Sequence, residues 1–303
     1  MAEICEGRHR AERRHGVIAI VERLPKYGRI FVELSLFFER VFRRFDNRRL
    51  RTFLGARSIP LLSHRAGGHQ AYADWCFHAG VYAGMLSAFQ PGRLRILDVG
   101  CGAGEIVPGV LHAISSDSAY LGVDIDPRMI RQCREAFVDP RAQFAVVEGG
   151  SPAYRPGRID GSRRLTEICG RNDWDVILAK ALFDHLSPAD AERYLHLFSA
   201  GLAPDGLIIA TFFLIDKPYG LISPGPDSRF RFDDVHPAQR GFRYSAAFNP
   251  VPEAQLAVEA ARLDEILVSA KLGIARVIPG TWRDPRGRMG LDMPDTLLLV
   301  HQK

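Results

Sequence analysis

The feature that most constrains this chain is a glycine-rich turn that directly follows a short apolar run. Residues 94–105 read LRILDVGCGAGE. An apolar run of this length predicts a strand that is buried on both faces of a parallel sheet. Glycine at every second position allows a tight turn and leaves no Cβ between the backbone and a ligand. The segment therefore predicts a strand, then a turn against which a flat nucleoside can lie, then a helix.

A second acidic strand end follows at the spacing expected for nucleoside binding. Residues 121–126 read LGVDID, about twenty residues after the turn, so Asp124 ends a second predicted strand. A carboxylate at this distance typically accepts hydrogen bonds from ribose hydroxyls. The glycine spacing is G-x-G-x-G, whereas a dinucleotide fingerprint has G-x-G-x-x-G. This difference argues against a nicotinamide cofactor, and an NAD(P)-dependent oxidoreductase is kept as an alternative.

The order of these features resembles motif I of the class I S-adenosylmethionine (SAM) methyltransferases and the strand after it: a strand, an acid, the glycine turn, a helix, a second strand and a second acid. From about residue 69 onward the chain is similar to a bacterial branch that methylates small molecules or sugar hydroxyls. The matching segments are AYADWCFH at 71–78, SPAYRPG at 151–157, FDHL at 183–186, TFFL at 211–214, PEA at 252–254 and GTWR at 280–283. Ser151 stands where the branch usually has Asn, and Pro294 where Gln is common.

The order of predicted elements agrees with that resemblance. Strands and helices alternate, which favours a mostly parallel sheet with helices on both faces. The expected fold is a Rossmann-like, seven-stranded class I methyltransferase sheet over residues 66–303, closed by two strands of which one is antiparallel. Strands are expected near 94–99, 119–123, 143–147, 174–179, 206–214, 274–278 and 296–301, and helices near 105–115, 127–137, 163–169, 188–201 and 253–271.

Residues 1–65 form a different kind of segment, for which we expect a helical N-terminal extension. They hold fifteen Lys and Arg against seven Asp and Glu, while the whole chain carries +5. Apolar residues from Phe31 to Phe45 recur at helical spacing. This helix can pack on the domain, form a homodimer contact or lie on an anionic membrane surface. We therefore keep a membrane-associated SAM-binding module without turnover as a second alternative.

The cysteines and the charge pattern favour a reducing compartment and small partners. The five cysteines are scattered and contain no C-x-x-C pair, so a disulfide framework or a zinc site is not indicated. No apolar stretch is long enough to span a bilayer, and the N-terminus is too charged for a signal peptide. No nucleic-acid-binding motif accompanies the basic leader. We expect a cytoplasmic protein, with a peripheral membrane contact as the alternative.

The resemblance implies a set of cofactor-binding residues. Asp98 lies beside the glycine turn and either orients it or meets the methionine amino group, and Asp124 holds the ribose. Ile125 and Met129 are placed to flank the adenine, and Glu148 follows the third strand, where an acid often reaches the adenine amine. The full set comprises Asp98, Gly100, Cys101, Gly102, Gly104, Asp124, Ile125, Met129, Glu148, Ser151, Lys180 and Ala181.

A catalytic pair is expected just beyond the fourth strand. His185 is the candidate base, because an imidazole near neutral pH can take a hydroxyl proton, and Asp184 orients it or replaces it. A purely structural histidine is the competing interpretation. Residues 216–250 are predicted to form a lid or acceptor wall, because so long a connection is usually functional. The acceptor-binding candidates are Tyr72, Trp75, His78, Tyr154 and His236.

Two questions stay open at this point. Asp233, Asp234 and His236 could hold Mg²⁺ or Mn²⁺ together with His185, although a solvated acidic loop explains them as well. The acceptor is expected to be a hydroxyl of a sugar or secondary metabolite, but the sequence does not decide between oxygen and nitrogen. The predicted function is transfer of a methyl group from SAM to a small molecule.

Overall fold

The computed structural model describes residues 59–60, 72–90, 92–147, 162–170, 173–216, 230–246, 249–283 and 291–302 of the 303-residue chain. All of them lie in one compact unit, residues 58–303. The predicted extension over 1–65 falls outside the described residues apart from Ile59 and Pro60, so its proposed helix, membrane and dimer roles stay predictions.

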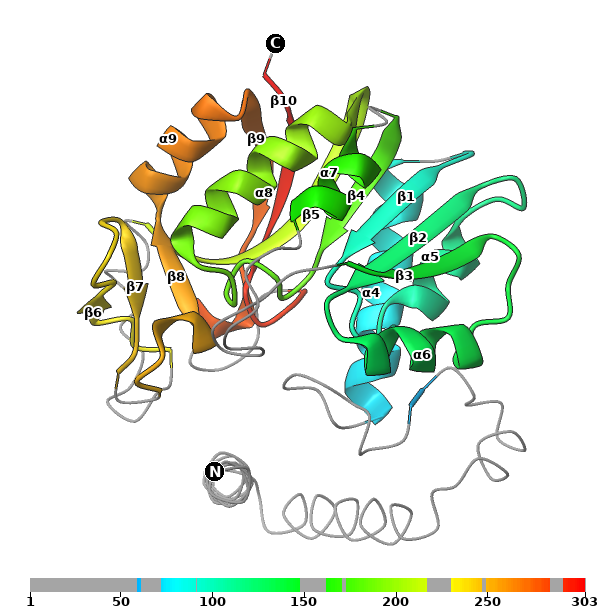
Figure 1. Ribbon diagram of the computed structural model, residues 1–303, viewed down its shortest axis with the longest axis horizontal. Helices are drawn as coiled ribbons and strands as arrows, with labels where there is room; N and C mark the ends of the chain where they lie inside the picture. Colours follow the sequence, from blue (N-terminus) through cyan, green and yellow to red (C-terminus); the bar gives the residue numbers. More distant parts are fainter. Residues whose placement is uncertain are drawn as a thin grey trace, which may run out of the picture. The chain divides into compact units, whose positions relative to one another are not determined.

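Five parallel strands form the first part of the sheet. They are β1 (Arg95–Val99), β2 (Ala119–Asp124), β3 (Ala142–Val146), β4 (Trp174–Ala179) and β5 (Leu202–Ile215). Their order in space is β3-β2-β1-β4-β5, so the chain changes direction across the sheet between β1 and β4 (Figure 1). This order places the carboxyl ends of β1 and β4 side by side, where open sheets of this type bind ligands.

Helices cover both faces of the sheet. One core contains residues of α4 (Tyr72–Phe89), α5 (Val107–Ala113) and α6 (Pro127–Ala136). The opposite core contains residues of α7 (Ser162–Cys169), α8 (Pro188–Gly201) and α9 (Ala260–Ser269). The predicted α/β layers are confirmed.

The sheet is completed from the C-terminus. β10 (Asp295–His301) runs antiparallel between β5 and β9 (Leu272–Ile278). The prediction that two late strands close the sheet, one of them antiparallel, is confirmed.

The helix predicted over 253–271 is only partly correct. Its first part is a 3₁₀ turn, η3 (Pro252–Ala254), followed by a strand, β8 (Leu256–Glu259), and helix α9 begins at Ala260. β8 runs parallel to the end of β5 and antiparallel to β7 (Phe242–Tyr244), which pairs with β6 (Asp234–Val235). The described residues therefore form a ten-stranded sheet instead of the seven strands expected, and part of the predicted lid over 216–250 forms two of these strands. A short buried apolar run cannot be assigned to helix or strand by its periodicity alone.

A helix cap fixes the chain just beyond β4. The Ser187 Oγ atom accepts a hydrogen bond from the Asp190 amide at 3.2 Å, and Pro188 occupies the first turn of α8. A side-chain oxygen in this position satisfies a helix N–H that has no intrahelical partner. The cap therefore sets where α8 begins and limits the segment 180–186 to a short turn.

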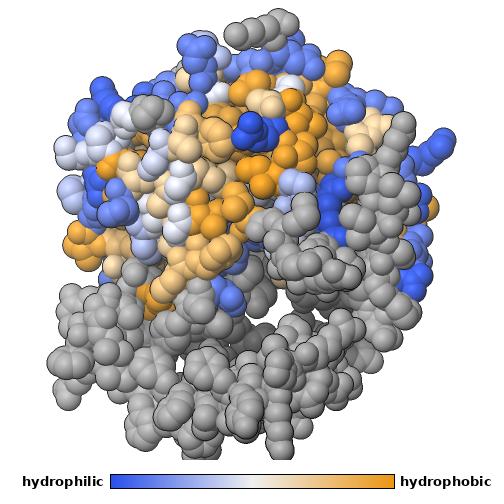
Figure 2. All heavy atoms as spheres, turned by 180° about the vertical axis from the view of Figure 1, so that it is seen from behind, coloured by the Kyte–Doolittle hydropathy of each residue, from blue (hydrophilic) through white to orange (hydrophobic). Residues whose placement is uncertain are grey.

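Helix α4 is apolar around most of its circumference. After Asp74 its sequence contains no charged Asp, Glu, Lys or Arg, yet Phe77 is 54% exposed. A Cβ atom added to Gly80 or Gly84 would meet nothing within 4 Å. Figure 2 shows apolar side chains gathered on the described part of the face seen from behind. None of the described helices is long and apolar enough to cross a membrane.

Candidate functional site

The glycine turn after β1 has the backbone geometry that its sequence predicts. Gly100, Gly102 and Gly104 have φ angles of +79°, +53° and +84°, a region that other residues rarely adopt. The amides of Gly100 and Cys101 both donate to the carbonyl of Val123, at 2.8 and 3.1 Å. The turn is thus held against the end of β2.

The three glycines meet different needs. A Cβ atom on Gly104 would lie 2.4 Å from the ring of Phe137, so this position is required for packing against the core. A Cβ atom on Gly102 would meet no atom within 4 Å. The backbone of Gly102 is therefore bare on a side that the protein leaves open, as a site for a flat ligand requires.

Asp124 lies directly beside this turn. One carboxylate oxygen accepts from the Gly102 amide at 2.9 Å, and the other accepts from the Asp126 amide at 2.8 Å. Burial raises the pKa of Asp124, although these N–H donors oppose the shift. Each carboxylate oxygen has a further lone pair, so Asp124 can still accept hydrogen bonds from two hydroxyl groups.

Asp98 occupies a different environment although it is one strand away. The side chain is 1% exposed and accepts a hydrogen bond of 2.5 Å from the Tyr120 hydroxyl. Burial raises the pKa of Asp98 to about 7, against the opposing effect of Tyr120. Its contact with Tyr120 lies in the core beneath the turn. This geometry fits support of the turn, one of the two predicted roles for Asp98.

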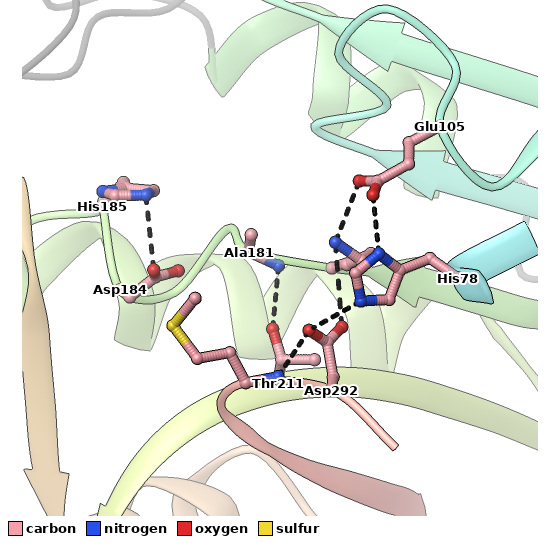
Figure 3. A network of polar contacts seen from close by, with 9 residues as sticks. His78, Glu105, Ala181, Asp184, His185, Thr211 and Asp292 are labelled. Carbon is pink, nitrogen blue, oxygen red and sulfur yellow. Dashed lines mark hydrogen bonds and ion pairs between the residues drawn. The ribbon is translucent and has the colours of Figure 1, made fainter. Parts of the chain in front are cut away.

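Four charged side chains meet at the carboxyl ends of β1 and β4. Glu105, which follows the glycine turn, contacts His78 Nδ1 at 2.7 Å and Lys180 Nζ at 3.0 Å. Asp292, which precedes β10, lies 3.5 Å from His78 Nε2 and 3.7 Å from Lys180 Nζ. Figure 3 shows the carboxylates of Glu105 and Asp292 on opposite sides of the His78 ring. We call these four residues the charge network.

The charge network favours the charged forms of His78, Lys180 and Asp292. Burial alone would lower the pKa of His78, but the contacts with Asp292 and Glu105 raise it to about 9. Burial likewise opposes the charge on Lys180, and the same two carboxylates raise its pKa. Burial would raise the pKa of Asp292, but Lys180 and His78 bring it down to about 2.

The end of β4 is strained at the predicted site residue Ala181. Its φ angle is +49°, which is unfavourable for a residue with a Cβ atom. The Ala181 amide donates to the hydroxyl of Thr211 at 2.8 Å, and Thr211 is fully buried in β5. Such strain persists only where the surrounding structure enforces it, and it occurs often at functional sites.

Asp184 and His185 form a pair beyond this strained residue. His185 Nε2 lies 3.3 Å from Asp184 Oδ2, and the Asp184 carbonyl accepts from the Leu256 amide at 2.8 Å. Asp184 Oδ1 is buried, and no hydrogen-bond partner for it is found among the residues that the structure describes. Figure 3 places this pair on the other side of Ala181 from the charge network.

The acidic residues of the predicted lid do not gather around a metal site. Asp233 pairs with Arg231 at 2.8 Å, and Asp234 accepts from the Ala246 amide at 2.8 Å. His236 is buried, and its Nε2 atom lies 3.5 Å from Glu253. Within the described ranges no group of three or more His, Cys, Asp or Glu side chains is placed to hold a metal ion. The alternative of a Mg²⁺ or Mn²⁺ site receives no support.

The remaining predicted residues fall into two groups. Trp75 and Met129 pack with Ala103 beside the glycine turn, while Ile125 packs against the main core and Cys101 is buried. Glu148, Ser151, Tyr154 and the side chain of Tyr72 lie outside what the structure describes.

Three residues of the site were not predicted from the sequence: Glu105, Thr211 and Asp292. Glu105 had a signal, because it directly follows the last glycine of the turn. Thr211 was noted only as part of the matching segment TFFL, and Asp292 had no signal. The partners of both residues are distant in the sequence, and only the folded sheet brings them together.

A comparison with protein families finds a match over part of the chain. The family model described as "Methyltransferase domain" matches residues 97–208. This range runs from the middle of β1 into β5 and includes the glycine turn, Asp124 and the Asp184–His185 pair.

Among solved structures, the chain is similar to the mitomycin 7-O-methyltransferase MmcR, with 16% identity, 76% of this chain and 54% of that chain covered, and a TM-score of 0.48. The chain thus spans about half the length of that protein. It is similar to the 1,6-didemethyltoxoflavin-N1-methyltransferase of Burkholderia thailandensis, with 17% identity, 77% and 80% covered, and a TM-score of 0.45. It is also similar to the [4+2]-cyclase SpnF, with 17% identity, 79% and 83% covered, and a TM-score of 0.46.

Proposed function

We propose that the protein moves a methyl group from SAM to a small-molecule acceptor, and the match of residues 97–208 to the family model described as "Methyltransferase domain" supports this. The observation that carries the proposal is the open glycine turn with Asp124 bonded to it. The proposed acceptor group is a hydroxyl of a sugar or secondary metabolite. The family match favours this function over the nicotinamide-dependent alternative.

The residues around the turn fit SAM. Gly102 offers a bare backbone surface for the nucleoside, and Asp124 has free lone pairs for the two ribose hydroxyls. Trp75 and Met129, packed beside Ala103, supply apolar surface near the same turn. The acceptor then lies toward the ends of β4 and β5, on the side of Ala181, Asp184 and His185.

When bound, SAM supplies a methyl group that the acceptor oxygen can take in one displacement, in which the carbon–sulfur bond breaks. The task of the chain is to hold that oxygen in line with the bond and to remove its proton. In the proposal the proton passes to His185, whose Nε2 faces the Asp184 carboxylate at 3.3 Å. Asp184 orients the ring and balances the positive charge that develops on it.

Binding of SAM and of its demethylated product, S-adenosylhomocysteine (SAH), is the first test. Titration calorimetry should show that both bind the wild type and that Asp124→Ala weakens both by at least roughly tenfold, because hydrogen bonds to a charged group are lost. Asp205→Ala, at an exposed residue, is the matched control. Unchanged affinity in Asp124→Ala would remove the ribose assignment, and binding of NADH without SAM would favour a dehydrogenase.

The acceptor requires a separate experiment. Incubation with labelled SAM and a panel of hydroxyl- and amine-bearing metabolites should yield labelled products from hydroxyl acceptors. Label on amines alone would change the proposal to N-methylation. If SAM still binds but no member of the panel yields a labelled product, methyl transfer would be contradicted. The protein would then be a SAM-binding module without turnover.

A further inference from the structure

The charge network lies where the two halves of the sheet diverge. Glu105 follows the turn after β1, and Lys180 follows β4, the strand that pairs with β1. His78 reaches this point from α4, and Asp292 from the segment before β10. The ligands of open sheets bind at this switch point. Any ligand there lies close to two positive and two negative side chains.

The network is balanced and shielded from solvent. The side chains of Lys180 and His78 are 8% and 7% exposed, and those of Glu105 and Asp292 are 17% and 2% exposed. Charges in such a place are screened weakly by water and salt. With both carboxylates ionised the four side chains sum to zero, so removal of one partner leaves a unit charge that acts on a ligand beside it.

SAM and SAH differ in charge at one atom. The sulfur of SAM carries a methyl group and a positive charge in a sulfonium, whereas the sulfur of SAH is a neutral thioether without that methyl group, and the rest of the two molecules is the same. An unbalanced lysine at the end of β4 would therefore repel SAM and leave SAH almost unaffected. The ratio of the two affinities measures the charge of the protein around the sulfur.

We propose that Glu105 and Asp292 cancel the charges of Lys180 and His78 so that the site accepts a sulfonium, and that this balance sets the preference between SAM and SAH. The proposal rests on the proposed function. It makes Lys180 and Glu105 specificity-determining residues that act through charge, without contact with the reacting atoms.

Two substitutions of opposite sign test this proposal. Glu105→Gln leaves the network with one extra positive charge, so the Kd of SAM relative to that of SAH should rise about tenfold. This is the size expected for a unit charge at roughly 10 Å in a medium of effective dielectric constant about 20. Lys180→Met leaves one extra negative charge, so the same ratio should fall by a similar factor.

The double variant and a control complete the experiment. Glu105→Gln combined with Lys180→Met restores the balance, so the ratio should return to within about threefold of the wild type. Glu265→Gln removes a charge of the same sign from an exposed ion pair with Arg262, and it should not change the ratio. All Kd values are measured by calorimetry on variants whose folding is checked by circular dichroism.

The outcomes separate this inference from the proposed function. If each single variant weakens the binding of SAM and of SAH by the same factor, the network has only a structural role and the inference is wrong. If the wild type binds neither compound, the proposed function is wrong. Should Glu105→Gln fail to fold, Lys180→Met still tests the inference. A fall in the Kd of SAM relative to that of SAH would support it, because loss of structure cannot favour SAM over SAH, and an unchanged ratio would overturn it.

Discussion

Asp98 and Asp124 lie at the carboxyl ends of adjacent strands, yet only Asp124 is bonded to the open glycine turn. The sequence predicts both as site residues because each ends an apolar run. It does not show that the Tyr120 hydroxyl lies beneath the turn and takes Asp98 as its partner at 2.5 Å. The identity of a strand-end residue can be predicted from a motif, but its hydrogen-bond partner depends on the packing of the neighbouring strand.

The burial of Asp98 predicts a pH dependence of stability. Its pKa is 3.8 in an exposed state and about 7 in the fold, so between these values the folded chain holds a proton that the unfolded chain has lost. Protonated Asp98 therefore contributes fully to the free energy of unfolding below about pH 4. This contribution falls as the pH rises to 7, and the total loss is up to about 4 kcal/mol.

Asp98→Asn should remove this slope, because the amide is neutral at every pH. Urea unfolding should give the variant and the wild type similar stabilities near pH 4, and a higher stability for the variant at pH 8. Asp264→Asn, at an exposed carboxylate, is the control and should show the same pH dependence of stability as the wild type. If the free energy of unfolding changed with pH in the same way for Asp98→Asn and the wild type, Asp98 would be charged in the fold.

His185 is predicted to act on the acceptor and to have little influence on the cofactor. His185→Ala should leave the Kd of SAM almost unchanged and lower kcat by about 10²–10⁴-fold. The loss should decrease as the pH rises, because a more ionised acceptor no longer needs the base. A variant with lowered thermal stability but normal turnover per folded molecule would identify a structural histidine, and Asp184 would then be tested first.

At the scale of elements, the seven strands of the expected sheet were predicted within a few residues, and the helix over 253–271 was not. The error has a local cause. The segment 256–258 is apolar and buried at every position, so it shows no alternation that would mark a strand. The partner strand β7 lies in the long connection after β5, where no pattern predicted a strand.

Helix α4 allows a prediction about two glycines. Gly80 and Gly84 lie in the helix interior without a positive φ, and a Cβ atom on either would meet nothing within 4 Å. Replacement by alanine should stabilise the protein by about 0.5–1 kcal/mol at each position, because alanine loses less backbone entropy in a helix.

Gly109 in α5 is the matched control. A Cβ atom there would lie 1.8 Å from the carbonyl oxygen of Ala79, so Gly109→Ala should destabilise the protein. Chemical denaturation of the three single variants measures both effects. If Gly80→Ala and Gly84→Ala lowered stability, the exposed face of α4 would have to be in contact with something that needs bare backbone.

At the scale of the whole molecule, one buried carboxylate joins three distant segments. Asp295 is fully buried and accepts from the amides of Leu214 and Gly280 and from the side chains of Trp282 and Arg283. The sequence shows GTWR at 280–283 and Pro294-Asp295 only as separate similarities to a family. The structure shows that the two segments form one hydrogen-bonded cluster around Asp295. The spacing of these residues in the sequence does not predict this cluster.

This arrangement predicts a large loss of stability from a small change. Asp295→Ala should lower the free energy of unfolding by about 3–5 kcal/mol, because it leaves the buried Arg283 without its main partner. The double variant Asp295→Ala with Arg283→Met should recover part of the loss, since the buried cation is removed together with the buried carboxylate that balances it. Urea unfolding measures both. An equal or greater loss in the double variant would show that the hydrogen bonds to the backbone matter more than the charge.

The place of β10 has a consequence for the order in which the sheet can form. This strand follows β9 in the sequence, yet it lies inside the sheet between β5 and β9. Until residues 295–301 are in place, β5 and β9 each present an unpaired backbone edge, and such edges associate with other chains. This side of the sheet can therefore close only when β10 has paired with both of its neighbours.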